Sequence, residues 1–357
     1  MKTMKAIAAL CAATMAFSTM TLPVQAKTSK TETEVITMDD DTTVTKPKTK
    51  KSTKKSKSSQ VSWKNAGKPL QCTVKTERDF YKAMSNAIRL NAPTLKVTFD
   101  KSYKGRKNLR DGGLLDVYED CYVFDLGMSE YHYIGLSQRR NADGSIITFE
   151  FSYADKYYGN AFCYAYNTGD MTNISDKYAD MYEIFSEAAD NCTETTDLGK
   201  AEYAWNWVIT HFEYDYARYK SGNHIGLVES VNNPTATGKY LAVCEGYAGA
   251  YILLMRMLNI PCWAARIDDD NDAVNPHRGV CAQLNGEYRY FDPTWGKATT
   301  DTTKTNKVNP YNMTAKEAET YYESEGYTPI VSMHEVDMGA SLHRDLTFSE
   351  LEEYFIW

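Results

Sequence analysis

The chain has 357 residues, enough for two modest domains, and its 47 acidic and 40 basic residues give a net charge of −7. Without residues 1–60, 29 basic and 42 acidic residues remain, a net charge near −13. A body this acidic argues against nucleic acid as a partner. The six histidines are scattered and no Cys-x-x-Cys pair occurs, so we expect neither a metal site nor a cofactor.

Residues 1–26 have the three parts of a secretory signal. Lys2 and Lys5 form the basic start, an apolar stretch follows, and Val24-Gln25-Ala26 is a small-residue cleavage site. The apolar stretch contains hydroxyl residues and is short for a membrane span, which favours cleavage after Ala26 over a membrane anchor. We therefore expect an exported protein, either secreted or associated with the cell envelope.

Residues 27–60 are of low complexity. They are rich in Thr, Ser and Lys, with seven lysines among the twelve residues 46–57 and no aromatic residue. Such a segment cannot bury a core, so we expect a disordered linker. Two roles stay open for it. One is a solvated spacer, and the other is electrostatic adhesion of the lysines to an anionic cell-envelope polymer.

Residues 61–170 are predicted to form a small α/β domain of unknown role. A helix follows Thr76, and its apolar face consists of Phe80, Met84, Ala87 and Ile88. Asp143-Gly144 is a hairpin signal. Strands are expected at 94–100, 118–126 and 145–153. The tyrosines of this region suit either core packing or a sugar-binding surface, and their abundance along the whole chain favours packing.

Two more helices are expected before the central stretch. The first covers residues 172–190, with Ser175 as a plausible N-cap. The second carries an apolar stripe that consists of Leu198, Ala201, Trp205, Val208 and Phe212. His211 and His224 follow, and we interpret both as structural or exposed.

The stretch from Val243 to Leu258 places a cysteine at a helix start. Apolar residues recur there with helical spacing, and Asn259 suits the left-handed conformation that ends many helices. A helix N-terminus favours a thiolate, which is the nucleophilic form of cysteine. Cys244 is therefore a candidate nucleophile. The plainer alternative is a small buried hydrophobic residue.

A histidine and an aspartate follow on an expected hairpin. Asn285-Gly286 predicts a two-residue turn, which sets Gly279 opposite Asp292. His277 lies two residues before Gly279, so it shares a face with Asp292 and lies within reach of it. An aspartate so placed can hold an imidazole and stabilise its positive charge while the histidine serves Cys244. The alternative is a loop histidine and an ordinary turn aspartate.

These residues resemble the motifs of the transglutaminase-like superfamily in its exported bacterial members. Three segments are similar to Val-Cys-x-Gly-Tyr-Ala, Gly-Ile-Pro-Cys and Asp-Pro-Thr-Trp, namely residues 243–248, 259–262 and 292–295. The resemblance covers roughly residues 172–300. It implies an α+β fold with a papain-like core at 171–300. It also implies that Cys244 is the nucleophile, His277 the base and Asp292 the orienting acid.

The chain departs from the family pattern at one motif and leaves one donor unassigned. His277-Arg278-Gly279-Val280 stands where the family has His-Ala-Trp-Asn, so a tryptophan that commonly packs beside the site is missing. The Cys244 backbone N–H can supply one oxyanion donor. Asn232-Asn233-Pro234 replaces the more usual small and aromatic residues upstream, so no second donor is assigned.

The number of cysteines gives a second indication of an unpaired thiol. Cys11 lies within the signal, so seven cysteines would remain after cleavage. An odd number in an exported protein leaves one thiol unpaired, as a catalytic Cys244 requires.

The resemblance implies a thiol enzyme that acts on protein or peptide amides through an acyl-thioester on Cys244. Transfer of the acyl group to an amine would make it a crosslinking transglutaminase, and transfer to water a peptidase or deamidase. The alternative is a catalytically inactive binding module at the cell envelope. Residues 301–357 are expected to be a C-terminal extension with a helix at 314–323.

Overall fold

A computed structural model of the chain describes residues 36–37, 62–103, 135–153, 158–221, 227–267, 277–299, 309–327, 330–335 and 342–351. They all belong to one compact unit, Val35–Trp357. The expected signal, the expected strand at 118–126, Cys11 and His224 lie outside the described residues. No helix in the described ranges is both long and apolar enough to span a membrane.

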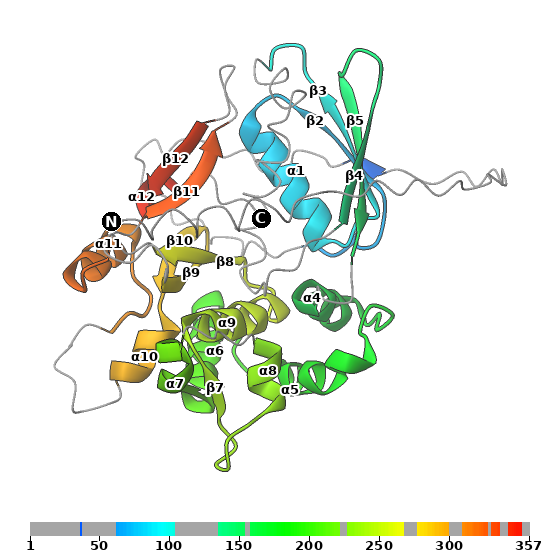
Figure 1. Ribbon diagram of the computed structural model, residues 1–357. Coiled ribbons are helices and arrows are strands. Elements are labelled where there is room, and N and C mark those ends of the chain that lie inside the picture. The colour runs from blue at the N-terminus through cyan, green and yellow to red at the C-terminus, as the bar shows by residue number, and fades with distance from the viewer. Residues whose placement is uncertain are drawn as a thin grey trace, which may run out of the picture. The chain divides into compact units, whose positions relative to one another are not determined.

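The N-terminal region contains a five-stranded sheet with the order β1-β2-β3-β5-β4. Its strands are β1 (Ile36–Thr37), β2 (Leu70–Val74), β3 (Thr94–Phe99), β4 (Gly135–Arg140) and β5 (Ile146–Ser152). Helix α1 (Glu77–Arg89) packs against β2 and β3 (Figure 1). The strands expected at 94–100 and 145–153 are present. Strand β1 lies within residues 27–60, the expected linker, and pairs in parallel with β2.

Helix α1 begins where the sequence predicts. Thr76 accepts a hydrogen bond from the Asp79 N–H at 3.1 Å, and the Asp79 carboxylate accepts one from the Thr76 N–H at 2.9 Å. This capping box satisfies N–H groups that no helical carbonyl reaches. Gly144 adopts a positive φ of 68° in the turn between β4 and β5, as the hairpin signal predicts.

A helical layer follows the sheet. It consists of α4 (Tyr158–Thr168), the 3-10 turn η2 (Asp176–Tyr178), α5 (Ala179–Asp190), α6 (Asp197–His211), α7 (Tyr216–Ser221) and α8 (Leu227–Asn232). The helix expected at 172–190 is therefore shorter, because η2 precedes α5. Leu198 is 41% exposed, so it does not belong to the buried stripe of α6. Phe212 begins β6 (Phe212–Tyr214), which pairs in parallel with β7 (Tyr240–Ala242).

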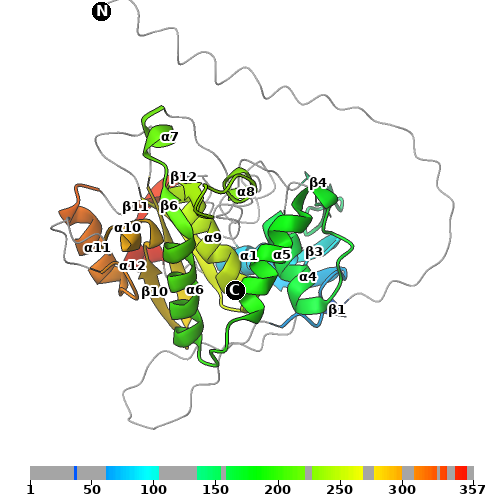
Figure 2. The same cartoon turned by 90° about the horizontal axis from the view of Figure 1, so that it is seen from below.

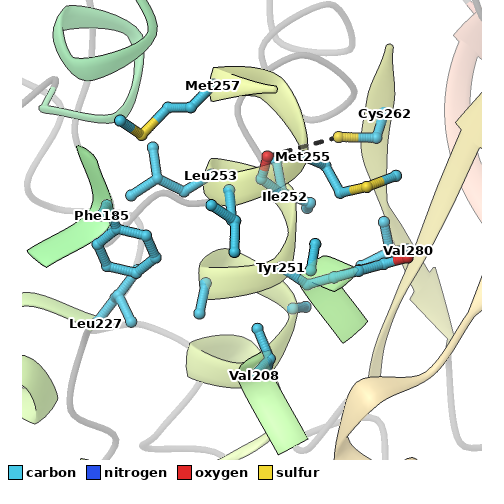
Figure 3. Close-up of a cluster of buried hydrophobic side chains, with 14 of the residues drawn as sticks. Phe185, Val208, Leu227, Tyr251, Ile252, Leu253, Met255, Met257, Cys262 and Val280 are labelled. Carbon is cyan, nitrogen blue, oxygen red and sulfur yellow. Dashed lines mark hydrogen bonds between the residues drawn. The ribbon is translucent and has the colours of Figure 1, made fainter. Parts of the chain in front are cut away.

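Helix α9 (Cys244–Met257) is buried on every side from Gly246 to Met257. The spacing predicted one apolar face, but helices α4, α5, α6, α8 and α10 (Pro293–Thr299) and three strands all contact α9 (Figure 2). Figure 3 shows Phe185 and Leu227 on one side of α9 and Val280 and Cys262 on the other. A helix that is apolar all round is a core helix.

The three-stranded antiparallel sheet has the order β10-β9-β8 and consists of β8 (Cys262–Ile267), β9 (His277–Leu284) and β10 (Glu287–Phe291). Leu284 pairs with Glu287, which is the register that the Asn285-Gly286 turn predicts. Both turn residues have positive φ, 53° and 84°. One face of the sheet joins the core around α9, while Trp263, Cys281 and Tyr290 join the core of the N-terminal sheet.

The C-terminal region is more structured than the sequence predicts. The expected helix is present as α11 (Ala315–Ser324), and a hairpin of β11 (Ile330–Glu335) and β12 (Leu342–Thr347) leads to α12 (Phe348–Leu351). This region is bound to β10. Tyr290 and Met313 exchange two backbone hydrogen bonds, and the Tyr290 hydroxyl donates to the Phe348 carbonyl at 3.0 Å.

Candidate active site

Cys244 is the first residue of α9. Strand β7 leads directly to Val243, the N-cap, which has an extended backbone and an apolar side chain that cannot accept a hydrogen bond. The N–H groups of the first helical turn have no partner within the helix. Cys244 itself is partly exposed and free, unlike the buried residues from Gly246 to Met257. The thiol therefore lies at an accessible, electropositive helix end.

His277 and Asp292 meet at the ends of neighbouring strands. His277 begins β9, and Asp292 follows the last residue of β10. His277 Nε2 lies 2.6 Å from Asp292 Oδ2, and the two side chains are 6% and 0% exposed. This is the cross-strand contact that the hairpin register predicts.

The Cys244 side chain also interacts with the ring of His277 and raises its pKa. Because Nε2 faces Asp292, Nδ1 is the nitrogen left for Cys244. Burial, the largest influence, lowers the pKa of His277, but the charge and hydrogen bond of Asp292 and the contact with Cys244 together outweigh it. The pKa of His277 is raised to about 10. The imidazole between the other two side chains is therefore strongly basic.

Asp292 accepts hydrogen bonds from two further groups. The backbone N–H of Trp295 donates to Oδ1 at 3.2 Å. The hydroxyl of Tyr322 donates to Oδ2 at 3.1 Å, so this oxygen also serves His277. A fully buried carboxylate is costly unless donors surround it, and these contacts supply them.

Aromatic rings enclose the His277–Asp292 pair. The Trp295 ring stacks on the imidazole, with centroids 4.5 Å apart and an angle of 12° between the planes. The rings of Tyr327 and Tyr322 lie 5.8 and 6.1 Å from it. They keep water from the pair, and a charge interaction is stronger where water is excluded.

The space beside Gly279, where the family has a tryptophan, is filled by a side chain from another part of the sequence. A Cβ on Gly279 would lie 2.6 Å from the Tyr322 hydroxyl oxygen, closer than any real contact. Tyr322 therefore occupies space that any larger residue at position 279 would need. Sequence reasoning missed Tyr322, although the missing tryptophan was a signal that another residue had to fill the site.

The other cysteines and histidines differ from the site residues. Cys72 and Cys192 are also free and partly exposed, so an unpaired thiol does not by itself mark the nucleophile. Burial and the nearby Asp79 raise the pKa of Cys72 to about 12. His211 stacks on Trp207 and hydrogen-bonds its carbonyl oxygen through Nδ1 at 2.7 Å, which confirms the structural interpretation of that residue.

Among the residues that the structure describes, no three His, Cys, Asp or Glu side chains are grouped so that they could hold a metal ion. In the segment 232–234, where the sequence assigned no second oxyanion donor, the Asn233 amide donates to the Glu229 carbonyl at 2.9 Å.

Comparison with known proteins identifies the central domain. Residues 186–293 match the sequence profile of the transglutaminase-like superfamily. No match was found among curated protein sequences. The segment that carries Cys244, His277 and Asp292 is thus a transglutaminase-like domain, and the α+β fold with a helix-start cysteine followed by antiparallel strands is as predicted.

Three solved structures are similar to the chain at low identity. One is a TGase, with 15% identity and a TM-score of 0.31 over 73% of this chain and 64% of the other. Another is a candidate protease from Parabacteroides distasonis, with 11% identity and a TM-score of 0.23 over 45% of this chain and 30% of the other. A third is a candidate cysteine protease from Cytophaga hutchinsonii, with 13% identity and a TM-score of 0.26 over 45% of this chain and 62% of the other. The chain spans less than two thirds of the length of each of them.

Proposed function

We propose that this protein is an exported thiol enzyme that acts on amides of proteins or peptides through an acyl-thioester. The observation that carries the proposal is the placement of His277 between the Cys244 thiol and the buried Asp292 carboxylate. Such a chain of nucleophile, base and orienting acid activates a thiol. The family of the central domain supports the same chemistry.

In the first half-reaction, His277 already holds the proton of the Cys244 thiol on Nδ1, because its pKa is raised to about 10, and the Cys244 Sγ attacks the amide carbonyl carbon. The carbonyl oxygen becomes an oxyanion, and the backbone N–H of Cys244 is positioned to donate to it. The carbon–nitrogen bond then breaks, and His277 gives its proton to the leaving amine. The acyl group remains on Cys244 as a thioester.

Asp292 acts on the ring rather than on the substrate. Its hydrogen bond to Nε2 fixes the ring so that Nδ1 faces Cys244. Its negative charge stabilises the imidazolium form of His277. Because Asp292 is fully buried, its charge is poorly screened by water and acts mainly on His277.

The second half-reaction has two outcomes. A lysine or other primary amine that attacks the thioester gives amine transfer and crosslinking, and water gives a peptidase or deamidase. The second candidate function is an inactive binding module at the cell envelope. The family's His-Ala-Trp-Asn is replaced here by residues 277–280, His-Arg-Gly-Val, and this change favours the binding module. The contacts among Cys244, His277 and Asp292 favour an enzyme.

The N-terminal 60 residues support export as part of the same proposal. The signal-like residues 1–26 would direct secretion, and the lysines of residues 27–60 would hold the enzyme at an anionic envelope polymer or serve as a spacer. The acidic remainder of the chain has the opposite charge, so the adhesive role belongs to the linker alone.

The test compares the full-length chain with Cys244→Ala and with Cys192→Ala, which removes another free, partly exposed thiol. Each protein is incubated with casein and a fluorescent primary amine, and products are read by mass spectrometry. Amine incorporation that only Cys244→Ala abolishes establishes a transglutaminase, and cleavage or deamidation that it alone abolishes establishes a hydrolase. Equal behaviour of all three proteins would refute the enzyme and leave the binding module.

A further inference from the structure

Tyr322 reaches the candidate active site from outside the matched domain. It belongs to α11 and lies beyond residues 186–293, in the C-terminal extension. The start of α11 is fixed by a capping box in which Thr314 accepts from the Glu317 N–H and Glu317 accepts from the Thr314 N–H. The Tyr322 side chain is 1% exposed, so its hydroxyl needs a buried partner.

That partner is the Asp292 oxygen that His277 contacts. The Tyr322 hydroxyl lies 3.1 Å from Asp292 Oδ2, and His277 Nε2 lies 2.6 Å from the same atom. The hydroxyl is the donor because an ionised carboxylate only accepts. Burial and the nearby Asp292 charge raise the pKa of Tyr322 well above its ordinary value, so the hydroxyl keeps the proton that it donates.

We propose that Tyr322 is a positioning residue of the catalytic centre, which holds the Asp292 carboxylate in place for His277 and makes the C-terminal extension part of the active site. This inference rests on the thiol chemistry proposed above. With Trp295 bonded to Oδ1 and Tyr322 to Oδ2, the carboxylate cannot rotate about its own axis without losing a hydrogen bond.

The surroundings of Tyr322 argue for this role over packing alone. Its ring already has apolar neighbours in Phe348 and Trp295, at centroid distances of 5.8 and 5.7 Å, so packing does not require a hydroxyl there. Gly279 leaves open the space that the hydroxyl needs. Tyr322 thus stands beside the position where the family has a tryptophan, and we infer that it supports the site in that residue's absence.

Tyr321→Phe provides a matched control for Tyr322→Phe. Both tyrosines belong to α11, are nearly buried and contact the Trp295 ring, and only Tyr322 bonds Asp292. Each variant loses one hydroxyl group and keeps its ring. Thermal unfolding verifies that each variant is folded. Gly279→Ala is a second route to the same loss, because the added methyl group displaces the hydroxyl without removing it.

The first readout needs no substrate. The full-length proteins are treated with iodoacetamide at pH 6, where an ordinary thiol is almost wholly protonated, and alkylation of the Cys244 peptide is followed by mass spectrometry. A hydrogen bond to a buried charge is worth enough that Tyr322→Phe should slow alkylation of Cys244 by about tenfold. Tyr321→Phe should stay within about twofold of the wild type.

The second readout uses the casein and amine assay. Loss of a positioning contact lowers kcat and leaves KM unchanged, whereas general loosening of the protein would alter both. If Cys244 in Tyr322→Phe is alkylated at the wild-type rate, or at the same rate as in Tyr321→Phe, the inference is overturned. That result is distinct from failure of the proposed function, in which no variant acts on casein but the alkylation rates still decide the role of Tyr322.

Discussion

Gly279→Ala tests whether the hydroxyl of Tyr322 and the missing side chain at position 279 share one space. The new Cβ would lie 2.6 Å from the Tyr322 oxygen, while the next nearest atoms, on Ile267 and Phe291, are 3.3 and 3.4 Å away. Gly279 lies within strand β9, a conformation that alanine adopts freely, so the cost comes from these close contacts and chiefly from the one with the Tyr322 hydroxyl. The Tyr322 hydroxyl must therefore move and lose its hydrogen bond to Asp292.

The magnitude follows from the contacts. Loss of a hydrogen bond to a buried charge costs about 1.5–3 kcal/mol, and overpacking adds about 1–3 kcal/mol. Gly279→Ala should therefore lower the free energy of unfolding by about 2.5–6 kcal/mol. Tyr322→Phe should cost about 1.5–3 kcal/mol, since it loses the same bond without a clash. In the double variant the alanine meets no hydroxyl oxygen, so its cost should stay close to that of Tyr322→Phe alone.

Urea unfolding of the four proteins, followed by circular dichroism, measures this cycle. We expect the two substitutions to be non-additive by close to the full cost of Gly279→Ala, about 2.5–6 kcal/mol, with the double variant more stable than the sum of the single effects predicts. Equal slopes with urea would show that the unfolded states are comparable. Additivity within about 0.5 kcal/mol would mean that Gly279 and Tyr322 do not compete for space, and the reasoning would be wrong.

Two further predictions concern charge. The folded pKa of His277, about 10, exceeds its ordinary value of 6.5, so the stabilising effect of the charged ring is complete below pH 6.5 and is lost as the pH rises towards 10. The free energy of unfolding should fall by a few kcal/mol across this window. An equally steep fall in Asp292→Asn would contradict the assignment. Arg278 lies 3.9 Å from Glu245, and both side chains are about one quarter exposed, so Arg278→Ala should change the unfolding free energy by less than about 1 kcal/mol, with Glu245→Ala as its matched control.

Local signals in the sequence were sufficient for the elements that carry the three site residues. Asn285-Gly286 determines the turn, the turn determines the register, and the register places His277 near Asp292. Likewise, an apolar run that starts at Cys244 and ends before Asn259, whose φ is 67°, defines α9. Each of these inferences spans fewer than about twenty residues, where turn chemistry and periodicity are reliable guides.

Contacts between distant segments could not be obtained in this way. Spacing predicted one apolar face for α9, but burial on all sides depends on helices that pack from elsewhere in the chain. Tyr322 is thirty residues from Asp292 in sequence, and nothing in the local pattern of α11 distinguishes it from Tyr321. The hairpin β11–β12 was missed because the tail shows no pattern that sequence reasoning could use.

The cost of burying charge bears on the choice between an enzyme and an inactive binding module. His277, Asp292 and Tyr322 are at most 6% exposed and form one polar group inside an aromatic enclosure. A buried ionic pair can often be replaced by apolar residues of similar size with no loss of stability, so the fold alone does not require it. A binding surface does not require it either, because nearly all of this group is hidden from a partner. Cys244, at the edge of the group, is partly exposed, and a reactive thiol there does need a buried, oriented imidazole. The arrangement is therefore best explained by chemistry at Cys244.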